Sequence, residues 1–193
     1  MQPLSLKQFL INSNLVSPSS AEEIANVFTF KTIERNSFFL TEGKICDDYI
    51  FLQSGFMRAF AHDTEAKEVT TNFYSAGQVA FEVFSFFNRT KSKENIQALT
   101  DCEGWCINYE QLNGLFHSMP EFREFGRSVL VKGYAGLKNR MLNMITETAE
   151  QRYAQLLNTN PEIFQHAPLK HIASYLGITD TSLSRIRKEM AYK

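Results

Sequence analysis

The sequence has few of the residues that crosslink or bind metal in small domains. Its cysteines are three in number, Cys46, Cys102 and Cys106, so they cannot all pair within the chain. Cys102 and Cys106 lack a second ligand pair at the spacing of a zinc site. Since the sequence also shows no signal peptide, we expect reduced thiols in a cytoplasmic protein that has no metal and no cofactor.

Long apolar runs and an excess of one charge are missing as well. No apolar run approaches the ~20 residues that a membrane-spanning helix needs, so we expect no membrane partner. The net charge is only −1, which is unlike a chain that binds nucleic acid over its whole surface. There is also no nucleophile–base pair, no zinc-spaced cluster and no phosphate-binding glycine loop, so an enzyme is the least expected class.

The chain does contain enough apolar residues for a core. They make up 44% of its 193 positions, a length that suits one large domain or two small ones. Phenylalanine is unusually frequent, with 17 copies, and aromatic residues pack well on pleated strands. Composition therefore favours a folded chain with a β-rich core.

The first part of the sequence predicts a helical cover followed by a β-roll. Residues 1–27 carry apolar residues at helical spacing, whereas residues 29–109 alternate between apolar and polar in short runs separated by glycine. Such evenly spaced runs indicate a small antiparallel barrel or roll. The expected strands lie at 38–40, 49–52, 56–60, 69–73, 96–98 and 105–107. We expect a short helix within 77–87 and another at 110–117.

A long helix is predicted from about residue 121 to residue 145. Its apolar and small residues recur at steps of three and four, which is typical of a coiled coil or a pair of long helices. This stripe consists of Phe122, Gly126, Leu130, Gly133, Leu137, Met141 and Met144. A helix packed only on its own roll is the alternative. We favour a homodimer seam, because a helix of this length overhangs a small roll.

The pattern breaks again after this helix. Thr148 to Gln151 resembles a capping box that opens a new helix, which ends near Asn158 to Pro161. We therefore predict two domains. Residues 1–146 hold the roll and the long dimerisation helix, and residues 147–193 form an all-α domain.

The all-α domain contains the most specific pattern in the sequence. Two short helical faces flank Gly177, which can adopt the positive φ of a tight turn between crossed helices. Thr179 can cap the second helix, and Asp180 suits the positive end of its dipole. The apolar positions are Ile172, Ala173, Leu176, Leu183 and Ile186. This pattern predicts a helix-turn-helix, with residues 179–189 as the recognition helix.

The predicted recognition helix has a polar and basic outer face. Its residues that can contact bases or phosphates are Thr181, Ser182, Ser184, Arg185, Arg187 and Lys188. Residues 168–193 carry five basic and two acidic residues, a balance of +3, whereas residues 1–167 have a balance of −4. A near-neutral chain with one basic end is expected where only that end meets DNA. An ordinary helical hairpin with a glycine turn is the alternative.

A β-roll, a long dimer helix and a C-terminal helix-turn-helix, in this order, resemble the Crp/Fnr family of bacterial transcription regulators. The resemblance rests mainly on Gly43, Gly55 and Gly77 in the roll and on the segment 176–186. It implies an α+β chain whose antiparallel roll has the cyclic-nucleotide-binding fold, a double-stranded β-helix. It also implies a two-fold dimer that reads a near-palindromic DNA site.

The family's base-reading positions fall on Asp180, Thr181, Ser184 and Arg185. Arg185 matches the family's arginine, and a guanidinium can pair with both O6 and N7 of guanine. Thr181 stands where many members have glutamate, so the resemblance does not specify the operator. Members commonly have a β-hairpin wing in this domain, for which residues 158–168 are too few.

The ligand-binding residues of the family are altered. Glu82 matches the glutamate that binds ribose, but Phe81 replaces a glycine and blocks close backbone approach. Ser92 and Lys93 stand where an Arg-Ser pair would bind the cyclic phosphate, and lysine lacks the arginine fork. These four residues are therefore a candidate effector pocket, for an unidentified ligand other than cyclic AMP. The alternative is a structural or dimerisation roll in which nearby backbone N–H groups satisfy Glu82.

The expected function is that of a homodimeric, sequence-specific DNA-binding transcription regulator. Phosphate contacts are expected from Lys170, Thr179, Ser182, Arg187 and Lys188, with Lys193 as a further candidate. The expected partners are double-stranded DNA and a second copy of the chain, with RNA polymerase and an unidentified small effector as further candidates. The alternative is a small-ligand sensor or protein-interaction scaffold whose helix-turn-helix does not bind DNA.

Overall fold

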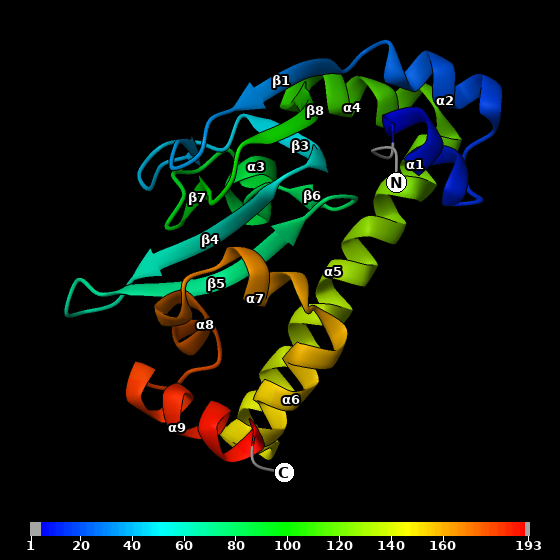
Figure 1. Ribbon diagram of the computed structural model, residues 1–193. Coiled ribbons are helices and arrows are strands. Elements are labelled where there is room, and N and C mark those ends of the chain that lie inside the picture. The colour runs from blue at the N-terminus through cyan, green and yellow to red at the C-terminus, as the bar shows by residue number, and fades with distance from the viewer. Residues whose placement is uncertain (1–4, 192–193) are drawn as a thin grey trace.

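The computed structural model describes residues 5–191, which form a β-roll, a long helix and a set of C-terminal helices (Figure 1). The strands are β1 (Thr29–Ile33), β2 (Phe38–Leu40), β3 (Asp48–Ser54), β4 (Phe56–His62), β5 (Glu68–Ser75), β6 (Val79–Ala80), β7 (Asn95–Ala98) and β8 (Cys102–Asn108). The helices are α1 (Leu6–Asn12), α2 (Pro18–Ala25), α3 (Val83–Asn88), α4 (Tyr109–Ser118), α5 (Pro120–Thr146), α6 (Ala149–Thr159), α7 (Glu162–His166), α8 (Leu169–Tyr175) and α9 (Asp180–Ala191). The α+β prediction is confirmed.

The roll consists of two antiparallel four-stranded sheets, in the orders β1-β8-β3-β6 and β2-β7-β4-β5. Alternate side chains of β3, β4 and β7 meet between the sheets, where Ile50, Met57 and Ile96 are fully buried. The predicted strands all lie within observed ones, and α3 and α4 form where short helices were expected. Sequence reasoning missed β1 and the two-residue β6. The side chains of β1 are mostly exposed, so this edge strand lacks the apolar alternation that reveals a strand.

The N-terminal helices cover one end of the roll, as predicted. Ser5 and Ser17 cap α1 and α2 by accepting from backbone N–H groups. Leu10 and Ile24 then bury against the roll core.

The long helix α5 confirms the predicted span, but its two halves differ. Its first turns are packed within the chain, since Phe122 and Gly126 are buried and a Cβ on Gly126 would lie 2.6 Å from the ring of Phe116. These two residues therefore leave the predicted dimer seam. Beyond them α5 extends past the sheets (Figure 1). Most of its apolar side chains there are exposed.

The chain turns back at Thr146, and α6 lies alongside α5 (Figure 1). Thr148 and Gln151 form the predicted capping box. The C-terminal helices do not have a separate core, because Ile172, Leu183 and their neighbours cluster with Phe56 and Phe73 from the outer face of the roll. The break predicted near residue 146 therefore separates two sets of elements that share one apolar cluster. None of the described helices is both long and apolar enough to cross a membrane.

Candidate nucleic-acid interface

The turn between α8 and α9 has the predicted helix-turn-helix geometry. Gly177 adopts φ +68°, and the N–H of Ile178 donates to the carbonyl of Ala173 at 3.0 Å. Ala173 is fully buried, so α9 crosses α8 closely at this small side chain. Local sequence determines this turn, because the glycine supplies a backbone conformation that other residues adopt at a cost.

The start of α9 is capped as the sequence predicts. Thr179 Oγ1 accepts from the backbone N–H of Ser182 at 3.2 Å, and the two hydroxyls lie 3.0 Å apart. Asp180 occupies the first turn, where a negative charge is favoured. Thr179 and Ser182 therefore have a structural role at this end, beside the phosphate contacts predicted for them.

One face of α9 is buried and the opposite face is open. Leu183 and Ile186 pack into the shared apolar cluster. On the opposite side, residues three, four and seven positions apart fall on one face of a helix. That outer face carries Thr181, Ser184, Arg185 and Lys188, all exposed, with Asp180 at its beginning. The four predicted base-reading residues are thus brought together on an accessible surface.

Arg185 is the most informative residue on this face. Its side chain is 68% exposed and lies 4.0 Å from the Glu189 carboxylate, one turn along the helix. An ion pair this exposed contributes little to stability, so it does not hold the guanidinium in place. The Arg185 guanidinium is therefore accessible on the outer face of α9.

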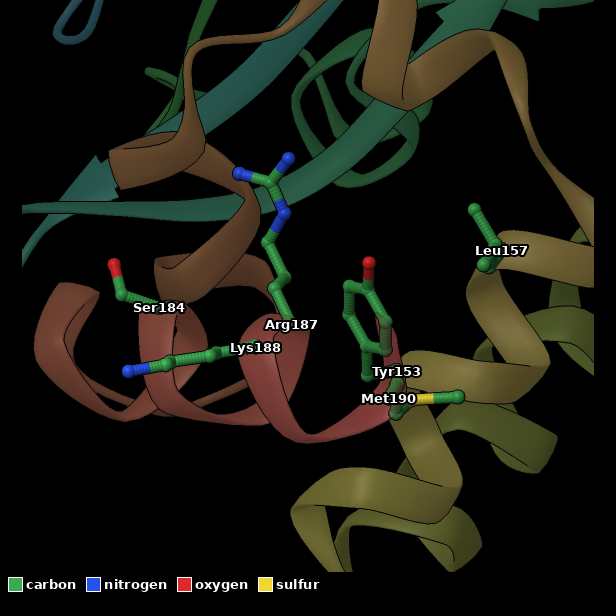
Figure 2. Close-up of a pocket in the computed structure, with 6 residues that line it drawn as sticks. All are labelled: Tyr153, Leu157, Ser184, Arg187, Lys188 and Met190. Carbon is green, nitrogen blue, oxygen red and sulfur yellow. The ribbon is translucent and has the colours of Figure 1, made fainter. Parts of the chain in front are cut away.

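A hollow of about 590 Å³ lies between α9 and α6 (Figure 2). Its α9 wall carries Ser184, Arg187, Lys188 and Met190, and its α6 wall carries Tyr153 and Leu157. Figure 2 shows Arg187 pointing away from Ser184 and Lys188, on the side of α9 nearer Tyr153. Neither Arg187 nor Lys188 has an ion pair within residues 5–191. Lys188 lies on the outer face and Arg187 lies beside it, so both cations are placed where they could contact phosphate oxygens.

The remaining predicted phosphate contacts are less central. Lys170 is exposed near the start of α8, close enough to Glu68 of β5 to help lower the pKa of that carboxyl. Lys193 lies outside the described residues. The region 158–168 holds the end of α6 and the short α7, so no β-hairpin wing occurs there, and no strand occurs within residues 147–191.

The helix α8 docks on β5 through a buried polar contact that sequence reasoning missed. Arg58 of β4, only 1% exposed, stacks 4.0 Å from the Phe60 ring centroid and pairs with Glu68 at 2.7 Å. Its other terminal nitrogen donates to Nδ1 of His171 on α8. Arginine has no acceptor, so this imidazole is neutral. Burial, together with the charges of Arg58 and Lys170, lowers the pKa of His171 to about 4.

Hydroxyl contacts extend this docking along β5. Ser174 Oγ accepts from the N–H of Thr70 at 2.8 Å and donates to the carbonyl of Glu68 at 3.3 Å. Burial would raise the pKa of Glu68, but the hydrogen bond and charge of Arg58 outweigh it and lower this pKa. The edge strand β5 is thus covered by the helix-turn-helix.

The predicted effector residues do not converge on an open site. The ring of Phe81 is buried against Tyr49, with centroids 5.1 Å apart. Glu82 caps α3 by accepting from the N–H groups of Phe84 and Ser85 at 2.9 and 2.7 Å, so nearby backbone N–H groups do satisfy this carboxylate. Ser92 is buried and bonds within its own loop, and Lys93 is exposed.

The cysteines and histidines give no sign of metal binding. All three cysteines are free and buried, and burial raises the pKa of Cys46 to about 11 and that of Cys106 to about 12. Within residues 5–191 no group of three or more histidines, cysteines and acidic residues could hold a metal ion.

Comparison with known proteins agrees with this architecture. Residues 30–119 match the family model of the cyclic nucleotide-binding domain. A search of the curated proteins found no match. The chain resembles the solved structure of a putative transcriptional regulator of the Crp/Fnr family from Eubacterium rectale, with TM-score 0.71, 13% identity, and coverage of 95% of this chain and 88% of that one. The chain has the Crp/Fnr regulator fold.

Two further structures show the same fold. FixK2 from Bradyrhizobium japonicum superposes with TM-score 0.73 at 15% identity, covering 86% of this chain and 85% of that one. CLP from Xanthomonas campestris, a c-di-GMP-responsive global regulator, has TM-score 0.72 at 16% identity, covering 91% and 92%. The shared fold thus extends over nearly the whole chain, from the roll through the C-terminal helices.

Proposed function

We propose that this chain is a sequence-specific DNA-binding transcription regulator that acts as a homodimer. The observation that carries the proposal is the outer face of α9. The buried Leu183 and Ile186 hold this helix on the shared apolar cluster. Thr181, Ser184, Arg185 and Lys188 stay exposed on its far side. An exposed helix with hydrogen-bonding and cationic side chains on one face is what the major groove admits.

The exposed part of α5 supports the homodimer. Its apolar side chains project beyond the roll and are uncovered in the single chain. They are Leu130, Val131, Tyr134, Leu137, Met141, Leu142 and Ile145, whereas Met144 is partly exposed and contacts the turn at Gly177. An apolar patch of this extent is typical of a protein interface. Paired α5 helices would place two recognition helices about 34 Å apart, one turn of the duplex. Gly133 and Gly136 have open space around them, which permits close approach of a second helix.

The proposal assigns no cyclic nucleotide to the roll. Phe81 fills the space beside Tyr49, and the Glu82 carboxylate is occupied by two backbone N–H groups. RNA polymerase and an effector of another kind remain candidate partners. The burial of all three cysteine thiols and the similarity to solved regulators favour a regulator over an enzyme.

The test is selection of bound duplexes from a random pool, repeated with and without cell extract. We expect enrichment of a two-fold-related motif and affinity that falls with salt, with a log–log slope of about 0.9 for each phosphate contact. Lys91→Ala, which removes one exposed cation from the roll, serves as the control. If no duplex is enriched under either condition and binding lacks salt dependence, the sensor or scaffold alternative holds instead.

A further inference from the structure

Two arginines outside the helix-turn-helix hold the end of α8. Arg140 of α5 donates to the carbonyl of Tyr175 at 3.0 Å, and Arg152 of α6 donates to the carbonyl of Leu176 at 3.1 Å. The last carbonyls of a helix have no intrahelical partner and carry the negative end of its dipole. The turn that leads into α9 is therefore hydrogen-bonded to both α5 and α6.

Arg140 also reaches the roll. It donates to the carbonyl of Thr71 on β5 at 2.6 Å, and its guanidinium stacks 4.1 Å from the ring centroid of Tyr175. Within residues 5–191 no carboxylate forms an ion pair with it. Burial lowers its pKa, yet its charge is matched mainly by carbonyl dipoles. One side chain of α5 thus contacts both β5 and α8.

A third contact comes from the next turn of α5. A Cβ built on Gly177 would lie 2.4 Å from Cε of Met144, so this methionine is seated directly over the turn. Met144 lies four residues after Arg140 and faces the same side of the helix. The turn is therefore held from α5 at two successive points, before α9 begins at Asp180.

We infer that Arg140 is a positioning residue that sets the spacing between the two DNA half-sites. The inference rests on the proposed function, in which α5 is the dimer helix and α9 reads the major groove. If α5 pairs with its copy, the angle between α5 and α9 determines the distance between the two recognition helices. The three-way contact of Arg140 fixes that angle, whereas Arg185 determines which base is read.

The test compares operators that differ only in the number of base pairs between half-sites. The wild-type chain selects one spacing over its neighbours. In Arg140→Met that preference falls about tenfold, the factor expected from loss of one charge-assisted hydrogen bond, while the half-site motif is unchanged. Arg140→Lys keeps the positive charge but not the planar guanidinium, so it gives an intermediate loss of the spacing preference. Arg127→Met is the matched control, since Arg127 is an exposed residue of α5 paired with Glu124.

A DNA-free measurement separates this inference from the proposed function. Amides of 169–178 exchange hydrogen about tenfold faster in Arg140→Met and at the wild-type rate in Arg127→Met. Equal exchange, or an Arg140→Met chain that discriminates spacing as sharply as the wild type, overturns the inference. A shifted base preference in that variant overturns it too. A wild-type chain that selects no duplex overturns the proposed function instead. Hydrogen exchange of residues 169–178 then still tests the contact of Arg140 with the end of α8.

Discussion

At the scale of the residue, the outer face of α9 distinguishes side chains that can read a base from those that can only attract a phosphate. Arg185 presents a planar fork that is largely exposed and weakly held by Glu189. Lys188 lies on the same face with no ion pair within the described residues, but its ammonium is a point charge. Replacing Arg185 and replacing Lys188 should therefore change DNA binding in different ways.

Replacing Arg185 by alanine should weaken binding to the selected operator by about 1–3 kcal/mol and relax the preference at one base position. The reason is loss of a paired contact to one guanine. Fluorescence anisotropy on operators with single base changes measures it. An unchanged preference at every position would show that Arg185 does not read a base.

Lys188→Ala is the matched comparison. We expect it to weaken all duplexes alike and to lower the salt slope by about one contact. A loss of affinity confined to one base pair would show that Lys188 reads a base and does not contact a phosphate.

At the scale of the element, the turn before α9 depends on Gly177. Alanine at this position must adopt φ near +68° and displace the methyl end of Met144. We expect Gly177→Ala to reduce the free energy of unfolding by about 1–2 kcal/mol, measured by urea denaturation. Gly114→Ala on α4, where a Cβ meets no neighbour, should instead be neutral or stabilising by up to about 1 kcal/mol. A loss of similar size at both glycines would refute this account.

The exposed half of α5 is the second element with a specific expectation. Leu137 is 64% exposed in the single chain and lies at the middle of the apolar stripe. Leu137→Glu should place like charges together across a paired helix and convert a dimer to a monomer, as measured by sedimentation equilibrium. Lys138→Glu changes the charge at the adjacent position of the helix and serves as the control. If the chain is monomeric without any substitution, the homodimer proposal is wrong.

At the scale of the whole molecule, docking of α8 on the roll should depend on pH through His171. Its pKa is lowered to about 4, while an unfolded histidine titrates near 6.5. Between these values the unfolded chain binds a proton that the folded chain excludes. The free energy of unfolding should therefore fall as the pH drops from about 6.5 to 4, by up to about 3 kcal/mol from this residue. Arg58 and Lys170 oppose protonation, and Glu68 and Asp180 partly offset them.

Urea denaturation across this pH range compares the chain with His171→Asn. The amide keeps an acceptor for Arg58 but does not titrate, so its stability should vary less with pH. Indistinguishable pH profiles would show that His171 does not govern the stability of this contact.

Much of the fold and of the candidate site could be predicted because the signals are local. Alternation in 49–60 and 69–73 indicated strands, and Gly177 between two short apolar faces indicated the turn. The outer face of α9 followed from helical periodicity alone, and the structure brings its four predicted residues together. The exposed β1 escaped prediction because its residues carry no periodic apolar signal.

The sequence by itself determined the order of elements, the conformation of the turn and the chemistry of the outer face of α9, since each depends on residues within a few positions of one another. Only the tertiary structure decided what α8 and α5 pack against. The contacts of Arg58 with His171 and of Arg140 with Thr71 join residues 113 and 69 positions apart. A basic residue looks alike in sequence whether it faces water or a distant carbonyl. Its partner is selected by the packing of a shared apolar cluster, which exists only after the chain has folded.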